Sequence, residues 1–280
     1  MNLNCVSSVK FVNFCARWTF PMTLEITLLI ALLIFVVAVL YSTVGHAGAS
    51  GYLAAMALFG LAPAVMKPTA LTLNVIVAIV GTIRFVRAGF FSWRIFWPFA
   101  IASIPAAFAG GWVTLPASVY KAIVGVVLLY GAIRIFFSAK AADDQETRTP
   151  PMALALALGA ALGFLSGLTG VGGGIFLSPL LLLMRWARTK ETSGISVAFI
   201  LVNSIAGLLG HGVFAHFSSI ATLPRAALIW APAALAGGFV GTELGTRRLP
   251  IAGVRRWLSV VLVIAGLKLL SEVILPLLHR

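Results

Sequence analysis

The stretch Gly163-Phe-Leu-Ser-Gly-Leu-Thr-Gly-Val-Gly-Gly-Gly-Ile-Phe-Leu-Ser-Pro179 places six glycines and a proline inside an apolar run. That run extends from Pro150 to Met184 and carries no charged side chain. Glycine at this density opposes a continuous helix, because each glycine costs about 1 kcal/mol relative to alanine. In a bilayer, non-helical backbone persists only where protein or a water-filled cavity shields its polar groups. The stretch therefore predicts a broken membrane helix beside a cavity, as in a transporter.

The composition is that of a polytopic, all-α membrane protein. Of the 280 residues, 61% are hydrophobic and only 10% are charged, whereas soluble domains average about a quarter charged residues. The net charge is +13, but the basic residues are scattered in small groups between apolar runs. This is the positive-inside pattern rather than a nucleic-acid-binding face. The two cysteines, Cys5 and Cys15, both precede the first apolar segment, so neither a disulfide scaffold nor a cysteine metal site is expected. We predict no metal and no cofactor.

The apolar segments divide the chain into two membrane units. Residues 1–21 have mixed polarity and form an N-terminal extension, and Met22 is an alternative start. A signal peptide cleaved near Ala47-Gly-Ala49 is another interpretation of this end. Residues 22–137 form a first membrane repeat, 138–150 a polar linker, and 151–280 a second repeat. The expected apolar segments are 24–44, 50–60, 68–86, 95–113, 117–137, 152–168, 174–184, 192–215, 224–246 and 252–275.

Two of these segments, 50–60 and 174–184, are too short to cross a bilayer alone. Each follows a glycine-rich motif: Gly45-His-Ala-Gly-Ala49 in the first half and Gly170-Val-Gly-Gly-Gly174 in the second, 125 residues later. Further along, Leu115-Pro116 is matched by Leu249-Pro250 at a spacing of 134. The chain is therefore predicted to be a duplication with discontinuous, re-entrant helices in both copies.

The basic residues indicate how the two copies are oriented. In the first copy, the loop Arg84–Arg94 holds three arginines, while its neighbours hold only Lys67 and Lys121. In the second copy the equivalent loop has only Arg225, and the neighbouring loops hold the basic residues Arg185, Arg188, Lys190, Arg247, Arg248, Arg255 and Arg256. The basic bias thus alternates oppositely in the two copies, which favours an inverted repeat. A parallel arrangement of the two halves is the alternative.

The motifs Gly170-Val-Gly-Gly-Gly-Ile175, Ser178-Pro179 and Thr192-Ser-Gly-Ile-Ser-Val197, followed by Asn203-Ser204, resemble those of the TauE/SafE family of membrane proteins. The resemblance covers the chain from about residue 24 to its end. It implies a transporter of the bacterial inner (plasma) membrane that exports sulfite, sulfoacetate or related small organosulfur anions. The first-half motif departs from the fuller pattern at His46, Ala47 and Ala49, so the two half-sites are chemically unequal.

The glycines are the first candidates for binding the anion. Successive free N–H groups form an anion-binding nest, and a half-helix that starts near Ile175 would point its positive end at the same place. Close helix packing is the alternative role of such small residues. The candidates are Gly170, Gly172, Gly173 and Gly174, with Gly45, His46 and Gly48 in the first half.

A polar stripe supplies further binding candidates. Ser196, Asn203, Gly207 and His211 follow steps of seven, four and four residues, which place them on one helical face. Such a stripe faces a cavity or makes interhelical hydrogen bonds. Ser196 and Asn203 are the binding candidates here, with Thr72 and Asn74 in the first half.

The ionisable candidates are few. His46 and His211 are the histidines of the apolar core, and histidine is the side chain that titrates near neutrality. Glu243 is the one carboxylate well inside the apolar pattern, where Arg247, one turn on, favours a local ion pair. We name His46, His211 and Glu243 as candidates for proton coupling. A core so poor in carboxylates suits an anion and disfavours multivalent metal ions.

Lys67 and Lys190 each open a segment that follows a broken unit. They are expected either to extend their side chains to the membrane interface or to attract anions. Two other functions remain open: a membrane subunit or scaffold without transport, and an intramembrane serine protease using Ser166 and His211. The spacing Gly163-Phe-Leu-Ser-Gly167 is one residue too long for a rhomboid motif, and a single catalytic pair needs no duplication. A dinucleotide-binding fold is excluded because no third glycine or acidic partner follows Gly170-Val-Gly172.

Overall fold

The computed structural model describes residues 23–137, 147–214, 226–246 and 252–278, and these ranges contain ten α-helices and no strand. In the first half these are α2 (Leu24–Ser42), α3 (Ala49–Leu58), α4 (Pro63–Arg87), α5 (Trp93–Trp112) and α6 (Ala117–Phe137). In the second half they are α7 (Met152–Thr169), α8 (Gly174–Leu183), α9 (Thr189–Phe214), α11 (Ala227–Thr246) and α12 (Ala252–Leu278). The all-α fold predicted from the sequence is confirmed. The N-terminal extension, Met22, most of the polar linker and Arg247 lie outside the described residues.

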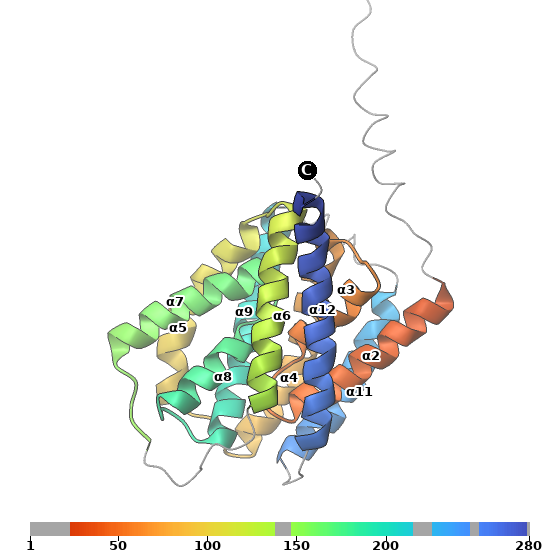
Figure 1. The fold of residues 1–280 in the computed structure, drawn as a ribbon. Coiled ribbons are helices and arrows are strands. Elements are labelled where there is room, and N and C mark those ends of the chain that lie inside the picture. Colours follow the sequence, from red (N-terminus) through yellow and green to blue (C-terminus); the bar gives the residue numbers. More distant parts are fainter. Residues whose placement is uncertain (1–22, 138–146, 215–225, 247–251, 279–280) are drawn as a thin grey trace, which may run out of the picture.

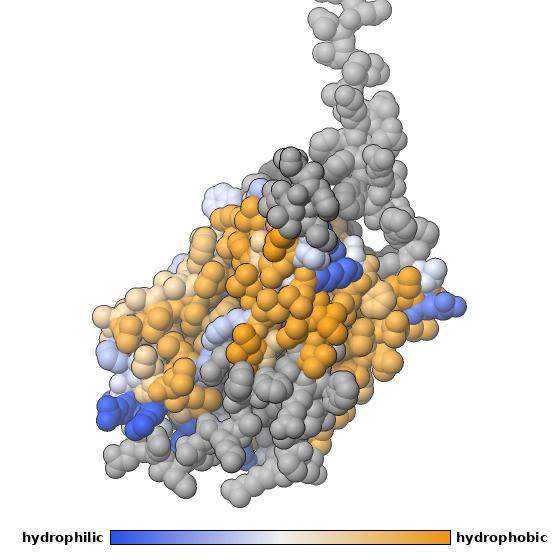
Figure 2. All heavy atoms as spheres, in the orientation of Figure 1, coloured by the Kyte–Doolittle hydropathy of each residue, from blue (hydrophilic) through white to orange (hydrophobic). Residues whose placement is uncertain are grey.

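Six of the helices, namely α2, α4, α5, α7, α9 and α11, are long and apolar enough to cross a bilayer. Large apolar side chains on them are exposed, among them Leu28 and Leu32 of α2 and Ile101 of α5. Apolar residues cover most of the described surface in the view of Figure 2. An apolar exterior of this kind faces lipid. The chain is a multi-pass membrane protein.

The helix boundaries follow local chemistry. Thr23 caps α2 by accepting the N–H of Ile26 through its hydroxyl, as expected at a helix start. Helix α4 begins at Pro63, earlier than the predicted start at 68, because a proline at the first helical position loses no hydrogen bond. Pro68 is tolerated inside the helix.

One helix of each half packs among the helices of the other half. Helix α5 of the first half packs against α7 and α9, whereas α11 of the second half packs against α2 and α4. We call α5, α7, α8 and α9 the α9 bundle, and α2, α3, α4 and α11 the α4 bundle. Figure 1 shows α5, α7 and α8 on one side and α2, α3 and α11 on the other, with α6 and α12 side by side in front. The bundles meet where α4 packs against α9.

Helices α4 and α9 hold equivalent places in the two halves, and so do α6 and α12. The helices of each of these pairs pack antiparallel to each other. Along α4 and α9, Leu71 lies beside Gly207 and Gly81 beside Val197. Along α6 and α12, Lys121 pairs with Glu272, and Gly125 lies beside Gly266. Antiparallel packing of equivalent helices is what an inverted repeat requires; the orientation of each half in a membrane stays a prediction.

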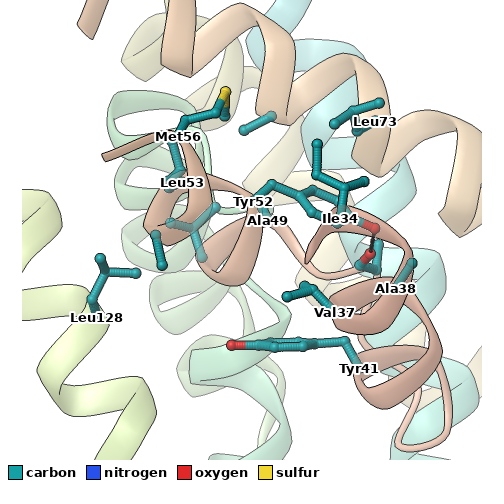
Figure 3. Close-up of a cluster of buried hydrophobic side chains, with 14 of the residues drawn as sticks. Ile34, Val37, Ala38, Tyr41, Ala49, Tyr52, Leu53, Met56, Leu73 and Leu128 are labelled. Atoms are coloured by element: carbon teal, nitrogen blue, oxygen red, sulfur yellow. Dashed lines mark hydrogen bonds between the residues drawn. The ribbon is translucent and has the colours of Figure 1, made fainter. Parts of the chain in front are cut away.

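A buried cluster fixes the short helix α3 inside the protein. Tyr52, Leu53 and Met56 of α3 are fully buried against Ile34 of α2 and Leu128 of α6, and Figure 3 shows α3 enclosed by its neighbours. Burial of such side chains stabilises a protein by about 1.5–3 kcal/mol each. In a bilayer, where the surroundings are apolar too, close packing contributes more than removal from water. The turn that precedes α3 is thus followed directly by a fully packed helix.

Candidate functional site

Two glycine turns interrupt the membrane helices. The first joins α2 to α3, with Gly45 and Gly48 at φ +74° and +108°. The second joins α7 to α8, with Gly170, Gly172 and Gly173 at φ between +80° and +84°. These are left-handed conformations that side-chain-bearing residues rarely adopt. Each following helix has only 10 residues, about 15 Å of length, so the discontinuous helices are present as predicted. Their re-entrant path across a membrane stays a prediction.

The second turn is tightly packed by residues of both bundles. A Cβ added to Gly172 would lie 2.7 Å from the Nδ2 of Asn74 and 3.1 Å from the Oγ of Ser204. A Cβ added to Gly173 would lie 2.9 Å from the ring of Phe199. The glycines thus allow close packing of the turn against both bundles, one of the two roles expected for them. Binding of a ligand by this turn stays a prediction.

The turn also presents backbone donors. The N–H groups of Gly172 and Gly173 donate no hydrogen bond to any residue that the structure describes. They immediately precede the N-terminus of α8, where the helix dipole is positive. Together with the neighbouring hydroxyl and amide groups, they form a set of donors suited to a small anion.

His46 connects the first glycine turn to the second. Its Nε2 lies 3.2 Å from the carbonyl oxygen of Gly174 and 3.1 Å from the Oγ of Ser178. The Oγ of Ser178 lies 2.7 Å from that of Ser196. The Nδ1 of His46 lies 3.2 Å from the carbonyl oxygen of Val44. A doubly protonated ring could donate to both carbonyls at once, whereas a neutral ring could donate to only one.

Asn74 makes the second connection between the bundles. Its Nδ2 donates to the carbonyl of Val171 over 3.3 Å and to the Oγ of Ser204 over 3.4 Å. Its Oδ1 is buried and has no hydrogen-bond partner among the described residues. The side chain is fully buried. An unsatisfied buried amide oxygen is unusual, and it marks a polar group to which a ligand or a water could bind.

The other sequence candidates do not reach the second turn by hydrogen bonds. Asn203 donates to the carbonyl of Phe199 on its own helix, over 2.8 Å. Thr72 likewise donates to Pro68. Gly207 packs against the backbone of Gly111 in α5. Ser204 was not among the predicted binding residues, although it lies about two turns from Ser196 on α9, a spacing that places both serines on nearly the same helical face.

The two lysines differ in their surroundings. Lys67 is 5% exposed, and its ammonium donates to carbonyls at the end of α5. Lys190 is half-buried and donates to the carbonyl of Thr246. The Nδ1 of His211 and the Oγ of Ser166 are buried and have no partner within the described part of the chain. The serine–histidine pair of a protease is therefore not formed.

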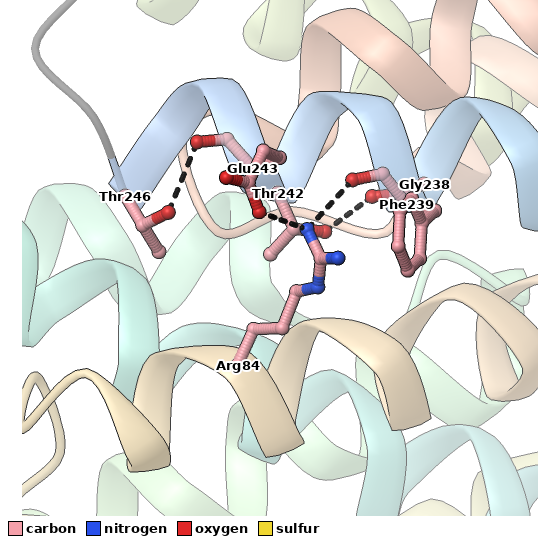
Figure 4. Close-up of polar contacts among 6 residues, drawn as sticks. All are labelled: Arg84, Gly238, Phe239, Thr242, Glu243 and Thr246. Carbon is pink, nitrogen blue, oxygen red and sulfur yellow. Dashed lines mark hydrogen bonds and ion pairs between the residues drawn. The ribbon is translucent and has the colours of Figure 1, made fainter.

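Glu243 forms an ion pair with Arg84 of α4. Its Oε2 accepts a hydrogen bond from the Nη1 of Arg84 over 2.8 Å, and the same nitrogen donates to the carbonyl of Phe239, as Figure 4 shows. The guanidinium also lies 3.7 Å from the centre of the Phe239 ring. The predicted partner, Arg247, lies outside the described residues. Helix α11 is thus linked to α4 within one bundle.

We expect Glu243→Gln to have a small effect. The side chains of Arg84 and Glu243 are 21% and 41% exposed. Exposed ion pairs contribute about 0–1 kcal/mol to the free energy of unfolding. The melting temperature of the purified protein should fall by no more than about 4 °C. Thermal unfolding in detergent measures this directly. A larger loss, or loss of a response to a pH gradient, would instead assign Glu243 a functional role.

Comparison with known proteins agrees with this architecture. Residues 30–269 match the family described as Sulfite exporter TauE/SafE. The chain is 43% identical over 244 residues to the probable membrane transporter protein y4hK of Sinorhizobium fredii, covering 86% of this chain and 97% of that protein. It is 30% identical to a probable membrane transporter protein of Methanocaldococcus jannaschii over 67% of this chain and 74% of that protein. It is 22% identical to the probable membrane transporter protein YunE of Bacillus subtilis over 75% and 82%, respectively. No solved structure matches.

The family match covers the two glycine turns and both helix bundles. The relatives are named as transporters and not as enzymes. The resemblance inferred from the glycine motifs is thereby confirmed. This chain belongs to the TauE/SafE family of membrane transporters.

Proposed function

We propose that this protein exports small sulfur-containing anions, such as sulfite, sulfoacetate or related organosulfonates, by alternating access. The observation that carries the proposal is the convergence of both bundles on the glycine turn Gly170–Gly174. Asn74 and His46 approach the turn from the α4 bundle, while Ser178, Ser196 and Ser204 approach from the α9 bundle. A site shared between two bundles opens when they separate and closes when they meet.

The chemistry of the turn suits an oxyanion. A dehydrated anion needs several hydrogen-bond donors in place of its water shell, and the Gly172 and Gly173 N–H groups, the three serine hydroxyls and the Asn74 amide can supply them. No carboxylate hydrogen-bonds to these groups in the described chain. Fixed negative charge, which would repel the anion, is thus absent from these contacts. The donors are supplied mostly by backbone and hydroxyl groups, which fits a tetrahedral or pyramidal oxyanion of small size.

His46 is the residue through which protons would be coupled to this site. Its two ring nitrogens contact both glycine turns, so a change in its protonation changes the bonds between the bundles. His211 has no such contact with the second turn. Coupling by H⁺ should therefore depend on His46 and not on His211.

The proposal is tested by efflux of radiolabelled sulfite from proteoliposomes, with sulfoacetate and sulfate as competitors and with and without an imposed pH gradient. We expect saturable efflux that sulfoacetate inhibits and that the gradient changes. His46→Gln should reduce the effect of the gradient at least about threefold, whereas His211→Gln should preserve it. An equal loss in both variants would remove His46 from its assigned role. Absence of flux for these anions and for a wider anion panel, in correctly inserted protein, would favour the scaffold function instead.

A further inference from the structure

The central helices α4 and α9 pack against each other and bring the two bundles together. They run antiparallel: Leu71, in the first half of α4, contacts Gly207, in the second half of α9. Gly81, in the second half of α4, contacts Val197, in the first half of α9. Leu71 and Val197 are 0% and 2% exposed. Each half of this helix pair thus holds one buried contact in which a glycine of one helix faces an aliphatic side chain of the other.

A lysine crosses between the bundles at the end of this pair where α4 begins. Lys67 belongs to α4, and its Nζ donates to the carbonyls of Gly110, Gly111 and Val113 over 3.4, 3.2 and 3.4 Å. These carbonyls lie at the C-terminal end of α5, which belongs to the α9 bundle. Cations are stabilised there because the end of a helix carries partial negative charge. Its ammonium pairs with no carboxylate of the described chain, so the link is made to helix carbonyls alone.

A second lysine makes the reciprocal link at the other end. Lys190 lies at the start of α9, and its Nζ donates to the carbonyl of Thr246 over 3.3 Å. Thr246 is the last residue of α11, which belongs to the α4 bundle. The ammonium also lies 4.4 Å from the centre of the Phe90 ring, just beyond the end of α4. Each bundle thus extends one lysine to the C-terminal helix end of the other.

We propose that Lys67 and Lys190 are paired latches that open alternately during the transport cycle. This inference rests on the alternating access proposed above. A rocking motion that separates the bundles at one end must withdraw one ammonium from its carbonyls, while the other lysine can keep its bond. In this structure the Lys67 latch makes three bonds and is buried, whereas the Lys190 latch makes one and is half-buried. The end that contains Lys67 is the more firmly closed.

Lys268 provides a matched control. It lies on α12, and its Nζ donates to the carbonyls of Ala57 and Leu58 over 2.9 and 2.7 Å, at the C-terminal end of α3. The chemistry is the same as that of the two latches, but α12 belongs to neither bundle. Lys268→Gln therefore removes a lysine cap without releasing one bundle from the other.

The test uses single cysteine reporters at Leu71 and Val197 in a protein whose Cys5 and Cys15 are replaced by serine. The rate of N-ethylmaleimide labelling is measured in proteoliposomes. Loss of a hydrogen bond from a charged group shifts the equilibrium between the two open states by a factor of about ten or more. Lys67→Gln should therefore raise the labelling rate of Leu71→Cys about tenfold. It should lower the labelling rate of Val197→Cys. Lys190→Gln should do the reverse, Lys67→Arg should resemble the native protein, and Lys268→Gln should change neither reporter.

The possible outcomes distinguish the proposal about the two lysines from the proposal about the transported anion. Equal labelling of each reporter in the Lys67→Gln, Lys190→Gln and Lys268→Gln proteins would overturn the proposal. If Leu71→Cys does not fold, Val197→Cys alone decides, because the two latch variants must move it in opposite directions. Reciprocal changes in a protein that carries none of the tested anions would support the latches and reject the proposed cargo. Sulfite flux with unchanged reporters would support the cargo and reject the latches.

Discussion

Replacing Gly173 with leucine is expected to reduce sulfite efflux about a hundredfold while the protein still inserts into the membrane, since left-handed strain and overpacking together cost about 2–5 kcal/mol. Gly173 has φ +80°, and a Cβ there would lie 2.9 Å from the ring of Phe199 and 3.3 Å from the Cβ of Ser166. A side chain would push the turn away from α9 and displace the N–H groups that face the proposed anion. Initial efflux rates in proteoliposomes measure the effect.

Gly89 supplies the matched control for this variant. It has φ +77°, close to that of Gly173, but no atom lies within 4 Å of an added Cβ. Gly89→Leu therefore introduces the same backbone strain without the clash at the turn. It should retain most of the native flux. Equal flux in the Gly173→Leu and native proteins, with both monodisperse and inserted, would remove the anion site from this turn.

Replacing Asn74 with leucine is expected to reduce efflux at least about tenfold, because the loss of a buried donor leaves its partners unsatisfied at about 1–3 kcal/mol each. Asn74 is the only described side chain of α4 that donates to the second glycine turn, and it does so at the carbonyl of Val171. Leucine has a similar volume but no donor. The comparison to make is the saturable efflux rate at equal amounts of inserted protein.

Asn203→Leu is the control for Asn74→Leu. Both side chains are amides, fully buried, with an unpartnered Oδ1 among the described atoms. Within the described residues, however, the Nδ2 of Asn203 donates only to the carbonyl of Phe199, on its own helix. We expect its loss to change efflux by less than about threefold, since an intrahelical hydrogen bond contributes about 1 kcal/mol. If both substitutions reduced efflux equally, the contact between bundles made by Asn74 would have no special role.

Much of the secondary structure could be predicted from the sequence because it depends on local chemistry. The interruptions at Gly45–Gly48 and Gly170–Gly173 follow from glycine's low helix propensity, and the short helices α3 and α8 begin and end within two residues of the predicted segments. The predicted start of α4 at residue 68 is five residues late. In the structure Pro63 begins the helix and Pro68 lies inside it.

The arrangement of the site could be predicted only in part because it depends on contacts between distant segments. Periodicity places Ser196 on an inward face, but it does not show that Ser178 and His46 meet there. The exchange of α5 and α11 between the halves leaves no local pattern in the sequence. For the same reason the burial of Lys67 and the pairing of Glu243 with Arg84 were missed, since each partner lies on a helix far away in the chain.

The most direct measurement of the central claim is counterflow of radiolabelled sulfite in proteoliposomes containing the native protein. A carrier whose single site faces each side in turn accumulates label transiently when unlabelled sulfite or sulfoacetate is trapped inside. We predict such transient accumulation with both anions and its absence in the Gly173→Leu protein. Entry of label that merely equilibrates, regardless of the anion trapped inside, would contradict alternating access at the glycine turn.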